Sequence, residues 1–485
     1  MVADRAGGAG ISPLGPPPPL TAQGEIRTIL ARILLPYPLR SAPMSRPLAV
    51  ICLAAGMGKR TKVSMPKVLL PLCGRTLVSS ALLAAAELKP ARTVVVLHNQ
   101  KERVQASLEK DLAGKFDGGS QSIHYVDQGE PNGTGHAVQV GMEPLKDFVG
   151  DVLVIYGDCP LMTAETLQDM VDLRADSACS ALTAYPDDVT GLGRILRSDE
   201  GHFVGIRESK DCSEEELQID EVNCGFYCFD SEMLRPALAR LQPNNAQGEY
   251  YLTDVIADFV SQGQVLPTAE AVDVAEIMGV NSLSDLSLVQ SVMQERILME
   301  HMSNGVLIVD PAATWIDHEV EIGSDSRILP CTVIGSGCKI GNDCEVGPFT
   351  HLRGGTVLGD GASLGNFVEA KNAQLGPGTK AKHLTYLGDA VVGANANIGC
   401  GTITANYDGV NKHQTKIGAG AFIGSGTVLC APSEVGDEAM TAAGAVVKPG
   451  SAIKAQELWL GVPARYLRQR DLPAAALPST GENKQ

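Results

Sequence analysis

The C-terminal third of the chain carries an aliphatic residue at every sixth position. In the first run of the repeat, nine of the ten positions hold Ile, Val or Leu. The first run is Ile316, Ile322, Ile328, Ile334, Ile340, Val346, Leu352, Leu358, Leu364 and Ala370, and the second is Ile417, Ile423, Leu429, Val435, Thr441 and Val447. A period of six fits neither a helix nor a simple alternating strand. It predicts a hexapeptide β-helix, in which one aliphatic side chain per short strand points inward.

The six-residue register is interrupted at three places. Short breaks fall at 370–375 and 387–392, and a longer one spans 404–416 with the sequence TANYDGVNKHQTK. We expect the longer segment to leave the coil as a loop.

The part of the chain before the repeat alternates short apolar runs with helical patterns. Strands are predicted at 48–53, 94–97, 123–126 and 152–156, and helices at 75–88 and 134–146. Short strands that are apolar throughout and alternate with helices are typical of a mostly parallel sheet covered on both faces. Ligands of such sheets bind beyond the carboxyl ends of the strands.

Three further segments complete the predicted organisation. Residues 283–303 have no Gly or Pro and show helical spacing of apolar residues, which predicts a connecting helix within 283–304. Residues 1–45 hold 8 of the 28 Pro and predict a disordered extension, with an over-extended start before Met44 as the alternative. The tail at 467–485 is also expected to be disordered. The predicted domains are therefore 46–282 and 305–466.

Composition and charge narrow the class of protein. Gly accounts for 52 of the 485 residues and aromatic residues for only 21, which suits a narrow repeat with tight corners. The net charge of −17 argues against non-specific nucleic-acid binding. We find no apolar run of about 20 residues that would span a membrane. The 12 Cys include no C-x-x-C pair, so reduced thiols in a cytoplasmic protein are expected.

The first candidate site follows the first predicted strand, in the sequence LAAGMGKR at 53–60. Gly56 and Gly58 allow the backbone N–H groups to face a phosphate, although a Gly-x-Gly can equally be a tight turn between strand and helix. The third Gly of a dinucleotide fingerprint is missing, and Arg60 stands where a helix would begin. Lys67, in the sequence PKVL, adds a cation well placed to meet a polyphosphate.

With its downstream Pro-Lys, this segment resembles the sugar-nucleotide pyrophosphorylases. The six-residue repeat narrows the resemblance to the family of bifunctional bacterial N-acetylglucosamine-1-phosphate uridylyltransferase/glucosamine-1-phosphate acetyltransferases. The resemblance covers residues 46 to about 465. It implies a Rossmann-like α/β nucleotidyltransferase domain, joined by a helix to a left-handed parallel β-helix.

The resemblance also assigns residues to the first site. It places Leu53, Ala54, Ala55, Gly56, Arg60 and Lys67 at the nucleotide, Gln128, Gly133 and Thr134 at the uracil, Tyr156, Gly157 and Asp158 in the crevice, and Gly193, Glu208 and Asn223 at the sugar and ribose. Asp158 and Asn281 would be ligands of Mg²⁺, which prefers hard oxygen atoms. Each assignment has a structural alternative. Thr134 could cap a helix and Asp158 a turn, and Gly193, Glu208 and Asn223 could be ordinary loop and strand positions.

The implied first reaction is nucleotidyl transfer. The phosphate of N-acetylglucosamine-1-phosphate attacks the α-phosphorus of UTP, and pyrophosphate leaves. Because the nucleophile is already anionic, catalysis needs positioning and charge neutralisation by Mg²⁺, Arg60 and Lys67 rather than a general base.

The second candidate site centres on His383, which lies between the two short register breaks. By resemblance, His383 is the general base that removes a proton from glucosamine-1-phosphate before the amine attacks acetyl-CoA, a role that suits an imidazole titrating near neutrality. Arg353, Lys371, Tyr386 and Asn397 would hold the sugar phosphate, and Cys400, Asn406, Tyr407, Ser425 and Ala443 would lie toward coenzyme A. Without the motif, His383 would be an ordinary surface residue, and Arg353 and Lys371 a solvated face.

Two positions depart from the family pattern. Cys400 stands where a close relative's pattern has Ala, and we expect the small thiol to be tolerated. Gly461 replaces an Arg that precedes the terminal Val-Pro, and Arg465 follows shortly after. The resemblance therefore assigns no residue to the coenzyme A phosphates at this end.

Three hypotheses are compatible with these features. The first, which we favour, is a bifunctional enzyme that makes UDP-N-acetylglucosamine for peptidoglycan and lipopolysaccharide precursors, as a cytoplasmic homotrimer. The second is a pyrophosphorylase with a purely structural β-helix, and the third is a non-enzymatic assembly subunit. Only the first predicts both the phosphate-loop cations and the His383 motif, and both are present.

Overall fold

The computed structural model describes residues 46–56, 58–115, 123–243 and 248–469. The described residues from Pro47 onward belong to one unit. The extension predicted at 1–45 lies outside the described residues, as does most of the predicted tail. The exception is 467–469, which belongs to strand β37 (Arg465–Gln469) instead of a disordered tail.

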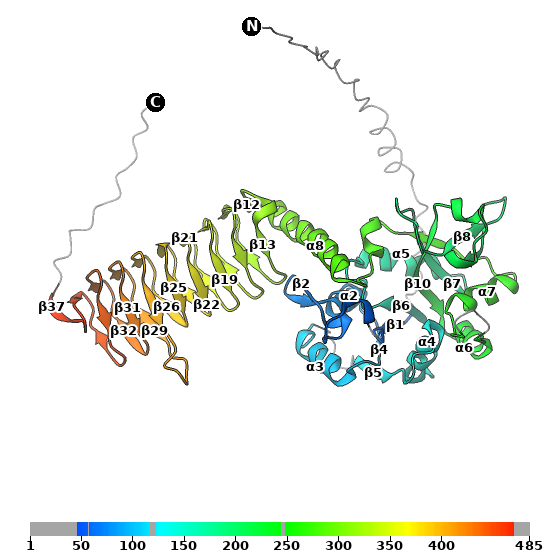
Figure 1. The fold of residues 1–485 in the computed structure, drawn as a ribbon, viewed down its shortest axis with the longest axis horizontal. Helices are drawn as coiled ribbons and strands as arrows, with labels where there is room; N and C mark the ends of the chain where they lie inside the picture. Colours follow the sequence, from blue (N-terminus) through cyan, green and yellow to red (C-terminus); the bar gives the residue numbers. More distant parts are fainter. Residues whose placement is uncertain (1–45, 57, 116–122, 244–247, 470–485) are drawn as a thin grey trace, which may run out of the picture. The chain divides into compact units, whose positions relative to one another are not determined.

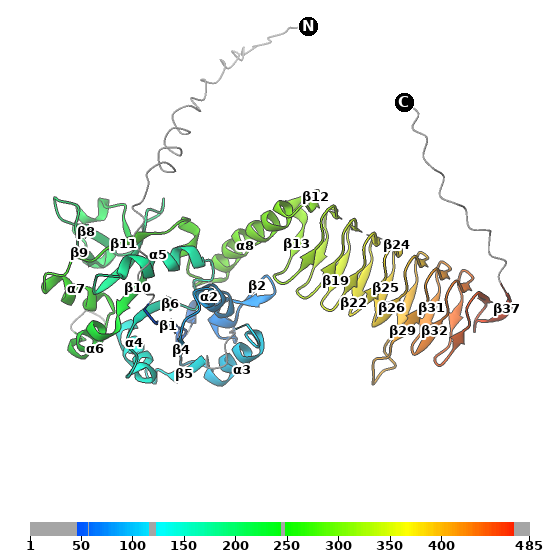
Figure 2. The same cartoon turned by 180° about the vertical axis from the view of Figure 1, so that it is seen from behind.

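The first domain is built around a nine-stranded sheet in the part of the chain that is described (Figures 1 and 2). Its strand order is β11 (Thr268–Glu270), β7 (Cys179–Ala184), β10 (Val222–Asp230), β6 (Asp151–Tyr156), β1 (Leu48–Leu53), β4 (Arg92–Leu97) and β5 (Ile123–Asp127), with β8 (Arg194–Arg197) and β9 (Phe203–Arg207) joined to β10. β6, β1, β4 and β5 are parallel, as the apolar runs predict.

Most strands of the sheet pair in parallel, as predicted, and β10 is an exception. It runs antiparallel to β6, β7 and β8. The physical reason is the connection that leads into β10. A parallel neighbour must be reached through a long crossover, usually a helix, whereas β10 follows the antiparallel β8–β9 pair directly.

Two apolar layers flank the sheet because successive strand side chains point to opposite faces. Ala49 and Ile51 of β1 pack in the layer with α4, α6 and α7, whereas Val50 and Cys52 pack with α2, α3 and α5. The helices are α2 (Leu77–Ala86), α3 (Lys101–Asp111), α4 (Thr134–Met142), α5 (Ala164–Arg174), α6 (Ser231–Arg240) and α7 (Thr253–Ser261). Short 3₁₀ helices are η1 (Lys59–Thr61), η2 (Lys67–Leu69), η3 (Glu143–Leu145), η4 (Ser209–Asp211), η5 (Glu216–Gln218), η6 (Val274–Ile277) and η7 (Pro311–Ala313).

Two predicted helices are shorter than expected, for local reasons. The helix predicted at 75–88 begins at Leu77, because β3 (Arg75–Thr76) first pairs with β2 (Pro71–Leu72). The helix predicted at 134–146 ends at Met142 and continues as η3, in whose first turn Pro144 removes a backbone donor.

Helix α8 (Leu283–Ser303) forms where the sequence predicts the connecting helix. It starts with a capping box, in which Ser282 and Asp285 each satisfy the other's backbone N–H. In the second half of α8, the buried Gln294 side-chain amide forms two hydrogen bonds with the backbone of Ile316 in the first coil. Its N–H donates to the Ile316 carbonyl at 2.7 Å, and its oxygen accepts from the Ile316 N–H at 3.1 Å. The amide therefore acts as a strand partner that joins the helix to the repeat.

The second domain is a parallel β-helix with three sheets, each a column of short strands from successive coils (Figure 1). The exception is the last strand of the first sheet, β37, which pairs antiparallel with β36 (Glu457–Leu460). The first sheet is β12 (Leu307–Ile308), β15 (Arg327–Ile328), β18 (Glu345–Val346), β21 (Ser363–Asn366), β24 (Lys380–His383), β27 (Asn397–Ile398), β30 (Phe422–Ile423), β33 (Met440–Thr441), β36 (Glu457–Leu460) and β37. The second is β13 (Trp315–Ile316), β16 (Val333–Ile334), β19 (His351–Arg353), β22 (Glu369–Lys371), β25 (Tyr386–Gly388), β28 (Ile403–Ala405), β31 (Val428–Cys430) and β34 (Val446–Val447). The third is β14 (Glu321–Ile322), β17 (Lys339–Ile340), β20 (Val357–Leu358), β23 (Gln374–Leu375), β26 (Ala390–Val392), β29 (Thr415–Ile417), β32 (Ser433–Val435) and β35 (Ala452–Ile453).

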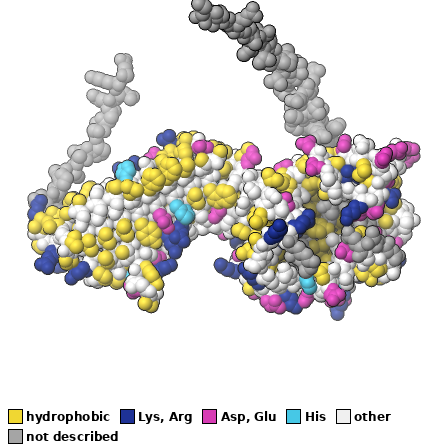
Figure 3. Space-filling view, viewed as in Figure 1, with side chains coloured by type: hydrophobic (Ala, Val, Ile, Leu, Met, Phe, Trp, Pro, Cys, Tyr) yellow, Lys and Arg dark blue, Asp and Glu magenta, His cyan; other side chains and the backbone are white. Residues whose placement is uncertain are grey.

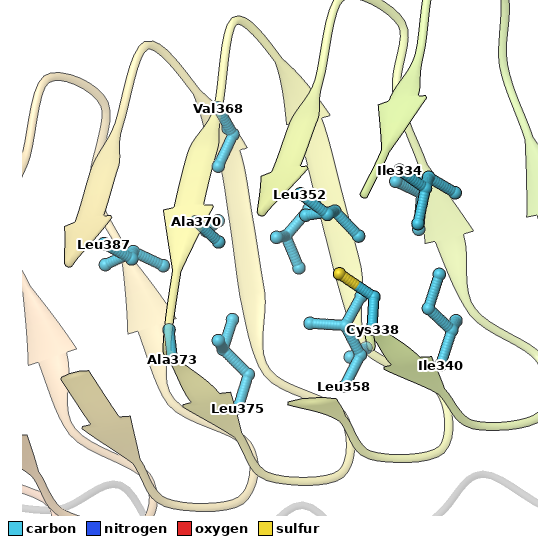
Figure 4. Packing of buried hydrophobic residues seen from close by; sticks show 14 of the residues in the cluster. Ile334, Cys338, Ile340, Leu352, Leu358, Val368, Ala370, Ala373, Leu375 and Leu387 are labelled. Atoms are coloured by element: carbon cyan, nitrogen blue, oxygen red, sulfur yellow. The ribbon is translucent and has the colours of Figure 1, made fainter. Parts of the chain in front are cut away.

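The six-residue repeat forms the core of this domain. All its members are buried except Ile322, which is half-buried near the first coil. Figure 4 shows Ile334, Ile340, Leu352 and Leu358 pointing into the coil interior. The two short register breaks are places where one side of the prism is one residue shorter, so that Leu375 and Val392 still point inward. These observations confirm the predicted fold class.

The long register break does leave the coil as a loop, although it is shorter than predicted. Thr404 remains buried in β28, and Thr415 begins β29, so the protruding segment is 406–414. No helix in the described part of the chain is long and apolar enough to cross a membrane.

Candidate active sites

A cavity of about 930 Å³ opens at the carboxyl ends of β1, β5 and β6. Figure 3 shows this hollow in the sheet domain, with Lys and Arg side chains at its rim. Twelve residues that the sequence assigns to the first site line it: Leu53, Ala54, Ala55, Gly56, Lys67, Gln128, Gly133, Thr134, Tyr156, Asp158, Glu208 and Asn223. Parallel strands bring their carboxyl ends to one sheet edge, which is why residues so far apart in sequence meet here.

The glycines after β1 make room for Lys67. Gly58 has a φ of +58°, and a Cβ at this position would lie 2.8 Å from the Cβ of Lys67. A Cβ at Gly56 would lie 4.0 Å from the Cε of the same side chain. Arg60 is exposed on η1 and does not line the cavity. The loop therefore positions one of the two predicted cations in the pocket and leaves the other outside it.

Lys67, Asp158 and Asn281 meet at one edge of the cavity. The Lys67 ammonium forms an ion pair with Asp158 Oδ2 and donates to Asn281 Oδ1 at 3.2 Å. The backbone N–H of Val280 donates to the carbonyl of Asp158 at 2.9 Å, and the N–H of Asn281 donates to Asp285 in the α8 capping box. The start of α8 therefore fixes Asn281 beside Asp158.

These contacts test whether the site suits Mg²⁺. One carboxylate oxygen and one amide oxygen converge on a single cationic nitrogen, which is the arrangement that a cation with hard oxygen ligands requires. The described residues contain no group of three or more His, Cys, Asp or Glu side chains able to hold a metal. Mg²⁺ usually keeps few protein ligands and takes the rest from phosphate and water, so the two residues fit it.

The residues predicted at the uracil form hydrogen bonds between side chains and backbone groups. Gln128 is buried and donates to the carbonyl of Gly133 at 3.1 Å. A Cβ at Gly133 would come within 2.5 Å of the Tyr250 carbonyl, so only Gly fits. The Thr134 hydroxyl accepts from the N–H of Leu252 at 3.1 Å and does not cap α4. The alternative of a simple helix cap at Thr134 is therefore wrong.

The predicted sugar end contains the half-buried carboxyl group of Glu208. Desolvation, followed by the charges of Asp211 and Asp254, raises the pKa of Glu208. The side-chain amide oxygen of Asn223 accepts from the Tyr227 hydroxyl at 2.9 Å, and the backbone N–H of Asn223 donates to the Gly193 carbonyl at 2.8 Å. Gly193 and Gly157 are thus backbone supports next to the cavity and are not among its lining residues.

The cavity also has lining residues that the sequence analysis did not single out. They include Pro131, Lys210, Asp211, Glu249 and Tyr251. Lys210 and Asp211 lie on η4, and the other three lie on loops. Loop residues carry no periodic pattern, so the sequence offers no signal for them beyond their closeness to Gly133 and Glu208.

In the β-helix, His383 is exposed at the end of β24, at the corner between the first and second sheets. Its carbonyl accepts from the Thr385 hydroxyl at 2.7 Å and from the Gly401 N–H, which fixes its backbone. Cys400 and Ser425 follow at the same corner of the next coils, where their carbonyls accept from the next turn. The predicted base and the predicted coenzyme A positions Cys400, Ser425 and Ala443 therefore share one edge of the prism.

Three cations gather at the other edge of the second sheet. Arg353 pairs in register with Lys371, and it also forms an ion pair with Glu369 at 3.0 Å. Close contact with the Lys412 ammonium, together with the charge of Arg353, lowers the pKa of Lys371. Lys412 was not predicted; its signal is its place in the loop that follows Asn406 and Tyr407. Like charges held together in this way favour a bound anion.

The other residues predicted for this site differ in exposure and in the contacts that they make. Tyr386 lies over Gly388, where a Cβ would come within 2.5 Å of its hydroxyl. Asn406 is buried and donates to Asp389, so the structure gives it a supporting contact instead of an open one. Tyr407 is exposed, and its hydroxyl donates to the Gly409 carbonyl at 2.6 Å. Asn397 lies on the first sheet between Lys380 and Phe422, away from Arg353 and Lys371.

The acidic partners of the loop are strongly held as anions. Burial alone would raise the pKa of Asp389, but hydrogen bonds from Asn372 and Asn406 and the charges of Lys412 and Lys371 lower it. Hydrogen bonds from the Asn411 backbone, the His413 ring and the Val410 backbone lower the pKa of Asp408 to about 2. Both carboxylates are therefore charged at neutral pH and fix the base of the loop.

Comparison with known proteins supports both halves of the chain. The sequence profile of the MobA-like NTP transferase domain matches residues 50–256, and that of the bacterial transferase hexapeptide (six repeats) matches residues 337–370. The crystal structure of a UDP-glucose pyrophosphorylase complexed with UDP-glucose covers 52% of this chain and 99% of its own, with 17% identity and a TM-score of 0.43.

Several curated proteins match this chain over most of their length and at higher sequence identity. The bifunctional protein GlmU of Corynebacterium diphtheriae is 43% identical over 82% of this chain and 89% of its own length. The proteins of the same name from Geobacillus thermodenitrificans and Paenarthrobacter aurescens are 40% and 42% identical, each over 83% of this chain and over 94% and 87% of their own. These matches confirm the resemblance drawn from the sequence and the expectation of a bifunctional transferase. The chain belongs to the family of bifunctional GlmU proteins.

Proposed function

We propose that each domain performs one half of UDP-N-acetylglucosamine synthesis, with uridylyl transfer in 46–282 and acetyl transfer in 305–466. The meeting of Lys67, Asp158 and Asn281 at the edge of a large cavity carries the first assignment. For the second, a fixed histidine at one coil corner and three cations at the next supply a base and an anion site.

In the cavity, the substrate phosphate of N-acetylglucosamine-1-phosphate attacks the α-phosphorus of UTP in line, and pyrophosphate leaves. Asp158 and Asn281 would hold Mg²⁺, which supplies charge neutralisation to the phosphates when bound. Lys67 neutralises further charge, and Arg60 approaches from outside the cavity. The backbone around Gly56 orients the phosphates, and Gln128 and Gly133 orient the base. Positioning and electrostatics then account for the rate enhancement.

On the β-helix, glucosamine-1-phosphate presents its phosphate to Arg353, Lys371 and Lys412. His383 removes a proton from the substrate ammonium, and the freed amine attacks the thioester carbonyl of acetyl-CoA. The C–N bond forms, the C–S bond breaks, and coenzyme A leaves as its thiol. The exposed edge beyond His383, lined by Cys400 and Ser425, is the place for the coenzyme A arm.

A homotrimer is supported by an apolar corner ridge, defined as Phe349, Phe367 and Leu384. Their side chains are 52%, 57% and 59% exposed, and the two Phe rings stack with centroids 5.1 Å apart. Each has a φ between 46° and 56°, a strained value for bulky residues, whereas later coils place Gly401 and Gly426 at this corner.

Leu384 of the ridge directly follows His383 in the chain. Arg353 and Lys371 lie at the far ends of β19 and β22, so the length of one short strand separates them from the ridge. A strand of three residues spans about 10 Å, so one chain presents the base and the anion site on separate edges. We expect a second copy to cover the ridge and to close the acetyltransfer site. None of the twelve Cys, all of which lie in the described residues, forms a disulfide, which supports work in the reducing cytoplasm.

Two assays on the purified full chain test this proposal. Coenzyme A release from acetyl-CoA with glucosamine-1-phosphate reports the β-helix, and pyrophosphate release from UTP with N-acetylglucosamine-1-phosphate reports the cavity. We expect both activities. Pyrophosphate release without coenzyme A release would favour a structural β-helix, and the absence of both would favour an assembly subunit.

A further inference from the structure

The Lys67 ammonium lies at the point where the two proposed Mg²⁺ ligands converge. We propose that Lys67 and the divalent cation compete for Asp158 and Asn281, so that metal binding transfers Lys67 from Asp158 to the nucleotide phosphates. This inference rests on the metal site of the proposed function. It adds a device that links metal entry to nucleotide entry.

The two acceptor oxygens are held more firmly than the ammonium. Asp158 is tied through its backbone to Val280, and the backbone of Asn281 is tied to the capping box of α8. Lys67 reaches them through four rotatable side-chain bonds, across Gly56 and Gly58. The movable partner in this cluster is therefore the lysine, and the oxygens form a fixed receptor for one cation.

The charges of the cluster permit only one cation at that receptor. Asp158 contributes a single negative charge, and the Asn281 amide contributes none. The Lys67 side chain is 9% exposed and that of Asp158 is 22% exposed, so water screens the repulsion between two cations only weakly. A divalent ion beside Asp158 must therefore displace the ammonium or bind weakly.

The displaced ammonium has one favourable destination. Lys67 lines the cavity next to Gly56, on the side where the nucleotide phosphates are proposed to bind. A triphosphate supplies negative charge there, whereas the carboxylate beside Asn281, that of Asp285, already accepts from the backbone N–H groups of Asn281 and Ser282. The metal and the nucleotide therefore bind with positive coupling, because each relieves the same ion pair. Metal alone binds poorly, and metal with nucleotide binds well.

Titration with Mn²⁺ alone, followed by electron paramagnetic resonance of the free ion, tests the competition. Lys67→Met keeps a linear side chain and removes the charge. Lys62→Met removes an exposed charge that stands near the same loop, and Asp158→Asn removes the charged ligand. We expect Lys67→Met to bind Mn²⁺ about 10-fold or more tightly than the wild type. Lys62→Met should match the wild type within about two-fold, and Asp158→Asn should lose binding.

Amine acylation of the wild-type chain, read by mass spectrometry, gives a second measurement that does not depend on the folding of a variant. Mn²⁺ should raise the labelling of Lys67 and leave that of Lys62 unchanged.

The outcomes separate the inference from the proposed function. If Asp158→Asn loses Mn²⁺ while Lys67→Met binds it no more tightly than the wild type, the competition is wrong and the metal site stands. Unchanged Lys67 labelling on Mn²⁺ binding would also overturn the competition. If Asp158→Asn binds Mn²⁺ as the wild type does, the metal site itself is wrong, and the inference falls with it.

Discussion

The two candidate sites of this chain are built in opposite ways. The first is a concave cavity whose floor is the carboxyl edge of a sheet, with Lys67 buried and paired inside it. The second lies on the outer corners of a prism, where His383, Arg353 and Lys371 lie at or near the surface. A sheet with helices on both faces can enclose a substrate within one chain. The interior of the coil is filled by the aliphatic side chains of the repeat and has no room for a pocket, so the coil needs a neighbour to make one.

This contrast has a consequence for what each site tolerates. In the cavity, burial strengthens each charge interaction, so the loss of one side chain removes much of the activity. On the prism, exposed charges are screened by water and act together, and the arrangement of chains matters as much as any single residue.

The largest effect should come from breaking the contact between copies. Phe349→Glu combined with Phe367→Glu places charges on the corner ridge, where the second copy is expected to pack. Acetyl transfer should fall on the order of 10⁴-fold, because the base and the anion site no longer share a pocket. Uridylyl transfer should stay within about two-fold. Sedimentation should report monomers.

Val357→Glu, on the third sheet, is the control for this experiment, because it adds a charge to an exposed apolar position outside the ridge. It should leave the oligomer and both activities intact. A monomer that keeps full acetyl transfer would contradict the account of a shared site.

The next largest effect concerns the cavity. Lys67→Ala should lower uridylyl transfer by about 10²- to 10³-fold, since it removes a cation from a partly desolvated phosphate site. Acetyl transfer by the same preparation should not change. Lys62→Ala is the matched control, and steady-state kinetics of both half-reactions are the measurement. Turnover near that of the wild type in Lys67→Ala would exclude this residue from the phosphate site.

A smaller effect is expected at the exposed anion site. Arg353→Ala or Lys371→Ala should raise the KM for glucosamine-1-phosphate by about 10- to 100-fold, the size expected for one charged hydrogen bond. Each variant leaves two cations in place, so catalysis should survive at high substrate. Lys416→Ala, which removes a lysine paired with Glu434 on the third sheet, should change nothing. An unchanged KM in both variants would place the phosphate elsewhere.

The smallest functional effect should come from the junction of the domains. The backbone N–H of His318 donates to the Cys73 carbonyl at 2.8 Å, and its ring Nε2 is buried without a partner. Burial, then the charges of Arg75 and Lys115, lowers the pKa of His318 from 6.5 to about 4. Both activities at neutral pH should be unaffected by His318→Gln.

The stability of the junction should nevertheless depend on pH. Because the folded pKa is depressed, the unfolded chain binds the proton first, and stability falls as the pH drops from about 6.5 to about 4. The loss should reach at most about 3 kcal/mol. Denaturant unfolding at several pH values should show a shallower loss in His318→Gln. An equal slope in both chains would show that another group titrates.

The parts of the fold that the sequence predicts well are those with local causes. The six-residue spacing places Ile334 and Leu352 inside the coil, and each short break marks a shortened side of the prism. The strand–helix alternation predicts β1 and β4, and the helical spacing of apolar residues at 283–303 predicts α8. The direction of β10 was not predicted, because it depends on its connection through the β8–β9 pair, which no periodicity reports.

The same division applies to the sites. The motifs identify Lys67 and Asp158, but their ion pair and the contact with Asn281 depend on three separate segments meeting. The hydroxyl of Thr134 bonds Leu252, 118 residues away, where a local cap was an equally good interpretation. Asn406 is buried against Asp389, and Lys412 reaches Lys371, because the loop folds back on the coil. Such long-range contacts leave no trace in the local pattern.

The most direct test of the account is His383→Ala, assayed in both half-reactions, with the exposed His202→Ala as control. If the two sites are independent and His383 is the base, acetyl transfer should fall by about 10²- to 10⁴-fold, and uridylyl transfer should equal that of the wild type. Acetyl transfer near that of the wild type, or an equal fall of both activities in a folded protein, would contradict the account.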